Sequence, residues 1–346
     1  MERLKLIKPL NKDAMEKSQD KWNNIAKPLH SLGMLEDAVI KMSGIYNTAD
    51  FELKKRRVIV MCADNGVVSE GVTQTGSEVT AIVAREMIVG NSSVNRLAKT
   101  YNAEVLPIDI GMAVDVKGVR NCKIAYGTDN IAKGFAMTKE QAKKSISVGI
   151  DMVRDSVKDG FDIIVTGEMG IGNTTTSSAL ASVILDLPVK EVTGRGAGLS
   201  DDALMRKIEV INRAIEVNKP DKNKPLELLS KLGGYDIAGI VGLFLGGAIY
   251  RIPIVIDGII SAVAAAIAVK IEPKSKNFML CSHVSNEPSG AKMLEYLGFK
   301  PIINAGMFLG EGTGGIMLLP LLDGALSVYK TAHSFNELPI KRYMEL

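Results

Sequence analysis

The stretch "FDIIVTGEMGIGNTTTSSAL", residues 161–180, decides the fold. Its β-branched, apolar beginning predicts a buried strand, and Gly167, Gly170 and Gly172 follow where that strand ends. Asn173 and a run of threonines then open a helical segment rich in alanine and serine. A strand that passes through a glycine loop into a helix is the unit from which α/β domains are built.

The same unit recurs along the chain. Apolar runs predict further strands at 56–63, 103–112, 252–258 and 277–285, and helical patterns occupy 76–89 and 138–160, where Thr138 is the expected N-cap. Strands that are apolar throughout, separated by helices, indicate a parallel sheet covered on both faces. Residues 1–25 and the segment after about residue 300 lack this alternation, and we expect them to form helices of a smaller lobe.

Composition excludes several classes of function. Aromatic residues make up only 5% of the chain, which argues against a stacking surface for single-stranded nucleic acid. The basic run "KKRR" at 54–57 is either a phosphate or nucleic-acid patch or a solvated helix end. Cys62, Cys122 and Cys281 are too far apart for a disulfide framework or a zinc cluster, and the histidines lack metal-ligand spacing. We therefore expect no metal and a reducing compartment.

One nearly apolar stretch, residues 252–269, has to be considered as a membrane span. Asp257 and Gly258 lie inside it, its first half is β-branched, and its second half is rich in alanine. This division indicates a buried strand, a turn and a packed helix. The N-terminus has no apolar signal region, so the expectation is a soluble, cytoplasmic protein with no membrane partner.

The expected ligand site lies at the carboxyl ends of the strands, where open parallel sheets bind their ligands. Four strand ends carry unusual sequences: "ADNGVVSEGVTQTG" (63–76), "GEMGIGNTTTSSAL" (167–180), "DGIISA" (257–262) and "SHVSNEPSG" (282–290). In the second, Gly170 and Gly172 let the backbone approach a ligand, and Asn173, Thr174 and Thr175 supply donors at a helix start. That loop is either a phosphate site or a tight structural turn. It matches neither a Walker loop nor G-x-G-x-x-G.

For three charged residues, the sequence leaves open whether the side chain faces a ligand or solvent. Glu168 sits at a strand end, where it either faces the cleft or is a solvated turn acid. Lys207 lies two helical turns after Ser200 and either reaches back to a phosphate or faces solvent. Glu311 lies in "MFLGEGTGGI" (307–316), which by itself predicts a solvated loop acid. No G-x-S-x-G motif occurs, which argues against hydrolase chemistry.

Together these loops resemble one family, the nicotinate-nucleotide:dimethylbenzimidazole phosphoribosyltransferases of cobalamin lower-ligand assembly. The resemblance covers nearly the whole chain in order, and its most specific parts are "GEMGIGNTTTSSAL", "GRGAGLSDD", "SHVSNEPSGAKMLEYLG" and "LGEGTGG". It implies a Rossmann-like large domain over 26–299 that binds the substrates. It also implies a small helical domain built from 1–25 and 300–346, and a dimer.

The resemblance also implies a reaction. Nicotinate mononucleotide gives its phosphoribosyl group to an aromatic lower-ligand base, with inversion at C1′ and release of nicotinate, and no metal or redox cofactor is required. By similarity Glu311 is the general base and Glu168 the second active-site carboxylate. The remaining expected substrate-binding residues are Gly170, Gly172, Asn173, Thr174, Thr175, Lys207, Asp257, Ser285, Gly310 and Gly312.

Two departures from the family leave the acceptor open. Asp64-Asn65-Gly66 stands where the family usually has Asp-His-Gly, and "TQTG" at 73–76 stands where Ser-Ala-Tyr-Pro is common. The acceptor is therefore either a benzimidazole, or a phenol such as p-cresol or another base such as a purine. With a phenolic acceptor, the chain is expected to be one subunit of a heterodimer. A non-catalytic subunit is a further alternative, although the retained Glu168 and Glu311 argue against it. An NAD-type oxidoreductase rests on fold analogy alone.

Overall fold

A single parallel sheet forms the centre of the molecule. The computed structural model describes residues 2–343, and its sheet has six strands in the order β3-β2-β1-β4-β5-β6, all paired in parallel. The strands are β1 (Arg56–Ala63), β2 (Ala103–Gly111), β3 (Arg120–Asn121), β4 (Ile163–Met169), β5 (Ile254–Ile256) and β6 (Met279–Cys281). The predicted α/β fold is confirmed, although β5 and β6 are shorter than the sequence suggested.

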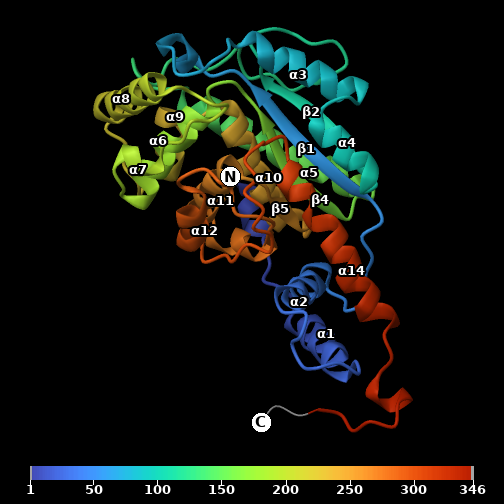
Figure 1. The fold of residues 1–346 in the computed structure, drawn as a ribbon. Helices are drawn as coiled ribbons and strands as arrows, with labels where there is room; N and C mark the ends of the chain where they lie inside the picture. The colour runs from blue at the N-terminus through green and yellow to red at the C-terminus, as the bar shows by residue number, and fades with distance from the viewer. Residues whose placement is uncertain (1, 344–346) are drawn as a thin grey trace.

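Helices cover both faces of the sheet (Figure 1). Alternate residues of β1 point to opposite sides of the sheet: Ile59 and Met61 belong to one hydrophobic core, whereas Val58 and Val60 belong to another. The α-helices are α1 (Lys12–Asn24), α2 (Met34–Tyr46), α3 (Glu78–Val89), α4 (Ser93–Thr100), α5 (Lys139–Lys158), α6 (Asn173–Leu185), α7 (Val189–Val192), α8 (Asp201–Asn218), α9 (Pro225–Leu232), α10 (Tyr235–Tyr250), α11 (Ile259–Ile271), α12 (Gly290–Leu297), α13 (Thr313–Ile316) and α14 (Leu318–Thr331). Short 3₁₀ segments occupy Glu2–Leu6, Gly66–Glu70, Pro273–Phe278 and Phe335–Glu337.

Local sequence explains how α5 begins and how closely it packs. Thr138 is its N-cap, as predicted, because its hydroxyl accepts the Gln141 N–H while the Gln141 side chain accepts the Thr138 N–H. Glycines then bring α5 against α10: a Cβ on Gly149 would lie 2.0 Å from the Gly239 carbonyl oxygen. The two helices approach so closely that no larger residue fits at this crossing.

The nearly apolar stretch 252–269 is a strand, a turn and a helix, as expected. It forms β5 and most of α11, and α11 is buried along nearly its whole length. Among the residues described, no helix is long and apolar enough to cross a membrane. The hydrophobicity of this stretch therefore reflects burial inside the domain.

Helices α1 and α2 from the first part of the chain and α14 from the last part form a smaller group of helices (Figure 1). The rings of Trp22 in α1 and Tyr329 in α14 lie with centroids 5.0 Å apart, and Ile25 forms an antiparallel bridge with Ser334. Helix α2 packs against both α1 and α14. The division into a domain of 26–299 and one of 1–25 with 300–346 stays a prediction.

Candidate active site

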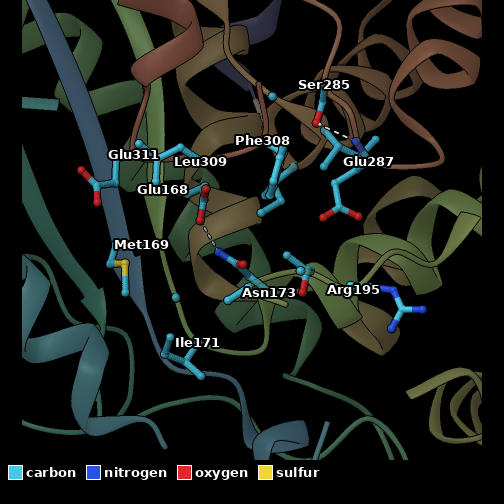
Figure 2. Close-up of a pocket in the computed structure, with 18 of the residues that line it drawn as sticks. Glu168, Met169, Ile171, Asn173, Arg195, Ser285, Glu287, Phe308, Leu309 and Glu311 are labelled. Carbon is cyan, nitrogen blue, oxygen red and sulfur yellow. Dashed lines mark hydrogen bonds between the residues drawn. The ribbon is translucent and has the colours of Figure 1, made fainter. Parts of the chain in front are cut away.

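A cavity of 570 Å³ lies at the carboxyl ends of β1, β4, β5 and β6 (Figure 2). Its wall combines the loops after these strands with the 305–311 loop and residues 195–199. The cavity lies where the strand order changes direction between β1 and β4, which is the usual ligand position in such sheets. The predicted location of the site is therefore occupied by a cavity.

Most residues singled out from the sequence meet on this wall. They are Glu168, Gly170, Gly172, Asn173, Thr174, Lys207, Asp257, Ser285, Gly310 and Glu311. Two do not line the cavity. The Thr175 side chain is buried in the core, and Gly312 lies behind the wall, where its N–H donates to Asp257 Oδ2 over 3.2 Å. These two residues support the wall instead of facing a ligand.

Two buried carboxyl groups, those of Glu168 and Asp236, share one hydrogen-bond donor at the cavity. The Asn173 side-chain amide donates to Glu168 Oε2 and also to Asp236 Oδ2, the second bond over 3.1 Å (Figure 2). Burial, reinforced by the neighbouring Asp236 charge, raises the pKa of Glu168 to about 8. Burial likewise raises the pKa of Asp236 to about 6. Glu168 is therefore a cavity acid that is largely protonated near neutral pH, not a solvated turn acid.

Asp257 fixes the loop that carries Glu311. Its Oδ1 accepts the Gly315 N–H over 2.7 Å and its Oδ2 accepts the Gly312 N–H. Burial raises the pKa of Asp257, and the adjacent His283 opposes this rise. Close packing completes the arrangement, because a Cβ on Gly314 would lie 1.9 Å from the His283 ring. Asp257 thus lines the cavity while both of its oxygens hold backbone.

Glu311 sits on a sharp left-handed turn. Its φ is 61°, and Gly310 and Gly312 beside it have φ of 89° and 92°. The carboxylate accepts the Val94 N–H at the start of α4 over 3.2 Å, and the Ser92 hydroxyl adds a hydrogen bond. Burial raises the pKa of Glu311, and these two donors oppose the rise. Glu311 is held in place by α4 and is not the solvated loop acid that its ten-residue stretch suggests.

The opposite end of the cavity is basic. The Lys207 ammonium donates to Thr174 Oγ1 over 2.9 Å and to the Gly194 carbonyl over 3.1 Å, and the residue is only 1% exposed. Burial lowers the pKa of Lys207 to about 8. Lys207 therefore reaches back to the glycine loop, and the solvent-facing alternative is wrong. Arg195 also lines this end.

Sequence reasoning missed several residues of the site. Asp236 stands at the start of α10, far along the chain from Glu168; its stretch "LGGYDIAGIVG" (232–242) also resembles the family, but no role for Asp236 is predicted from it. Phe308 and Leu309 line the cavity beside Gly310 and remain 60% and 61% exposed. Glu287 lies two residues after Ser285, in the strand-end loop after β6 that the sequence did indicate. Within residues 2–343 no group of three or more potential metal ligands is placed to hold a metal ion.

Comparisons with known proteins agree with this architecture. The family model described as "Phosphoribosyltransferase" matches residues 7–340. A protein of Acetivibrio thermocellus named nicotinate-nucleotide–dimethylbenzimidazole phosphoribosyltransferase is 46% identical over 342 residues, covering 98% of this chain and 97% of the relative. A Clostridium acetobutylicum protein of the same name is 45% identical over 345 residues, covering 99% and 98%. The crystal structure of CobT from Thermus thermophilus superposes with a TM-score of 0.89 at 31% identity, covering 96% of this chain and 100% of that one. The chain belongs to the nicotinate-nucleotide–dimethylbenzimidazole phosphoribosyltransferase family.

Proposed function

We propose that this protein transfers the phosphoribosyl group of nicotinate mononucleotide to a benzimidazole-type base, giving an α-ribotide and nicotinate for cobamide biosynthesis. The observation that carries the proposal is the two-ended cavity. One end offers the Lys207 ammonium and the start of α6 to a phosphate, and the other offers Glu168 and Glu311 to a reacting base. A nucleotide with its phosphate at the Lys207 end, followed by an aromatic acceptor at the Glu311 end, fits both ends of the cavity.

The chemistry makes few demands on the protein. A ring nitrogen of the acceptor attacks C1′, and the C1′–N bond to the pyridinium breaks with its electron pair passing to the departing nicotinate nitrogen. Nicotinate leaves as a neutral ring nitrogen, so its departure needs no general acid. The acceptor becomes cationic and must lose its N–H proton to a base. One positioned carboxylate is sufficient for this step.

We assign that base to Glu311, in accordance with the resemblance. Its partial burial raises its pKa, which makes the carboxylate a stronger base than a solvated one. Its backbone is fixed through Gly312 and Asp257, so its position is defined before the acceptor arrives. Glu168, with a pKa of about 8, is mostly protonated near neutral pH and can donate a hydrogen bond to a substrate. Two carboxylates in one cavity thus take different roles.

The comparisons favour a benzimidazole over a phenolic acceptor. The relatives that match most of this chain are named for dimethylbenzimidazole. In this chain the 73–75 segment, which departs from the family pattern, lines the cavity together with Phe308 and Leu309. Phe308 and Leu309 offer apolar surface for a flat ring, whereas Gln74 donates to the Gly198 carbonyl. We expect this segment to set the range of acceptors.

The test is to incubate the purified chain with nicotinate mononucleotide and dimethylbenzimidazole, and to follow nicotinate release and the mass of the ribotide. Adenine and p-cresol serve as competing acceptors. Formation of the benzimidazole ribotide by the chain alone supports the proposal and excludes a non-catalytic subunit. No nicotinate release with any of the three acceptors would refute it. If only p-cresol gives a product, the acceptor is a phenol and the benzimidazole assignment is wrong.

We also propose that the enzyme is a cytoplasmic dimer. Ile82, Ile88 and Val89 of α3 are large apolar side chains left exposed on one helix, together with Val114. An apolar group of this kind suits contact with a second chain. Sedimentation equilibrium of the purified chain distinguishes a homodimer from a monomer that awaits a different subunit.

A further inference from the structure

A third acid, Glu287, points into the basic end of the cavity and has no role in the proposed reaction. It lies on the loop after β6, and Figure 2 shows its carboxylate directed into the space between Phe308 and Arg195. The loop itself is fixed, because the Glu287 N–H donates to Ser285 Oγ over 3.4 Å. An acid is unexpected at the end of a cavity that is to receive a phosphate.

The contacts of this carboxylate are those of a bound anion. The Gly196 N–H donates a hydrogen bond to it, and the Lys207 ammonium stabilises its charge; both lower its pKa against the rise caused by burial. The carboxylate lies flat against Gly194, where a Cβ would come within 1.7 Å of Glu287 Oε2. Gly194, Gly196 and Lys207 together form a small anion cradle. The Glu287 carboxylate lies at the Gly194 side of this cradle, whereas the Lys207 ammonium itself donates to Thr174 and to the Gly194 carbonyl.

The cradle offers little positive charge. Lys207 is its principal cation, because the other nearby cation, Arg195, is paired with Asp201 and donates to the Leu199 carbonyl. A nucleotide phosphate carries a charge of about −1.5 to −2 near pH 7, more than a carboxylate does. A phosphate that approaches Lys207 therefore meets the negative charge of Glu287, and it finds the Gly196 N–H already used by that carboxylate.

We propose that Glu287 is an internal stand-in for the substrate phosphate, which must displace the Glu287 carboxylate from Gly196 and from the neighbourhood of Lys207 to bind. The inference rests on the proposed function, since it takes the Lys207 end as the phosphate end. Until the substrate binds, the carboxylate keeps the 194–196 backbone and Lys207 in their binding positions. It also sets a threshold, so that a phosphorylated nucleotide displaces it while weaker, singly charged anions do not. Glu287 is thus a specificity-determining residue.

Binding of inorganic sulfate, followed by calorimetry, tests this without any turnover. Glu287→Gln keeps the shape and the acceptor for the Gly196 N–H but removes the charge. We expect it to bind sulfate about tenfold more tightly than the wild type, which corresponds to about 1.4 kcal/mol. Glu191→Gln is the matched control, because Glu191 is a nearby exposed acid, paired with Lys292 over 3.1 Å, outside the cavity. We expect this control to leave sulfate affinity unchanged.

Three further measurements separate the alternatives. If Glu287 acts by charge, Glu287→Ala tightens sulfate binding as the glutamine variant does. If Glu287 only braces the loop, glutamine leaves sulfate affinity at the wild-type value and alanine weakens it, and the proposal is overturned. Loss of nicotinate riboside binding in Glu287→Gln would also overturn it, because the acid would then hold ribose hydroxyls. A Lys207→Met variant that binds sulfate normally would instead show that the phosphate end is misassigned, which is a failure of the proposed function.

Discussion

Replacing Glu168 by glutamine is expected to stabilise the folded protein at alkaline pH, although it removes a residue of the active site. Glutamine has the same shape and can accept the same hydrogen bond from Asn173. What it lacks is a carboxyl group whose charge is unfavourable in the folded state. The change therefore isolates the free energy that the protein loses by keeping an ionisable acid at the floor of its cavity.

The magnitude follows from the pKa. The ordinary value of 4.5 in the unfolded chain rises to about 8 in the folded protein, so the folded state binds more protons between these values. Stability is then fully present below about pH 4.5 and is lost as the pH rises toward about 8. At about 1.4 kcal/mol per pH unit, this window corresponds to about 5 kcal/mol. Because Asp236 and Asp257 share the repulsion, we expect the observed change to lie between about 2 and 5 kcal/mol.

The assay is urea unfolding of wild type and Glu168→Gln across this pH range. The difference in unfolding free energy between the variant and the wild type should grow in favour of the variant as the pH rises. For 346 residues, about 0.7 kcal/mol/K of unfolding entropy converts 5 kcal/mol to about 7 °C in Tm. Glu191→Gln, at an exposed ion pair, should change stability by less than about 0.5 kcal/mol at every pH. A constant difference between Glu168→Gln and wild type at all pH values would refute the reasoning.

Three other predictions concern catalysis, binding and packing. Glu311→Gln should lower kcat by about 10²- to 10⁴-fold with little change in Tm, and near-normal nicotinate release would remove Glu311 as the base. In calorimetry, Lys207→Met should weaken nicotinate mononucleotide binding at least about tenfold. The affinity of the wild type should fall as the pH rises through about 8, because Lys207 then loses its charge. In urea unfolding, Gly314→Ala should destabilise the fold by about 1–3 kcal/mol because its Cβ would meet His283. Gly324→Ala, which has open space around it in α14, should instead stabilise the fold by about 0.5–1 kcal/mol. Equal effects of the two substitutions would contradict the packing argument.

Some features of the site could be predicted because they depend on short stretches of sequence. A strand that is buried on both faces must be apolar throughout, so β1 and β4 are visible as runs of β-branched residues. Parallel strands present their carboxyl ends at one edge, so the hydrophobic pattern alone places the loops after β4, β5 and β6 together. The roles of Glu168 and Glu311 came from the resemblance, since an acid in a glycine loop has no local signal that separates it from a solvated one.

Other features depend on contacts between distant segments. Thr174 faces the cavity while Thr175 faces the core, because successive residues of a helix point in directions about 100° apart. Asp236 reaches Glu168 only through the fold, and it contributes to the raised pKa of that acid. The sequence by itself determined the parallel sheet, the edge of the sheet at which the cavity lies and the family, since these follow from hydrophobic pattern and motif. Only the tertiary structure decided which acids are buried and which carboxylate lies beside Gly194 at the basic end of the cavity, because burial and charge–charge distance are properties of the packed chain.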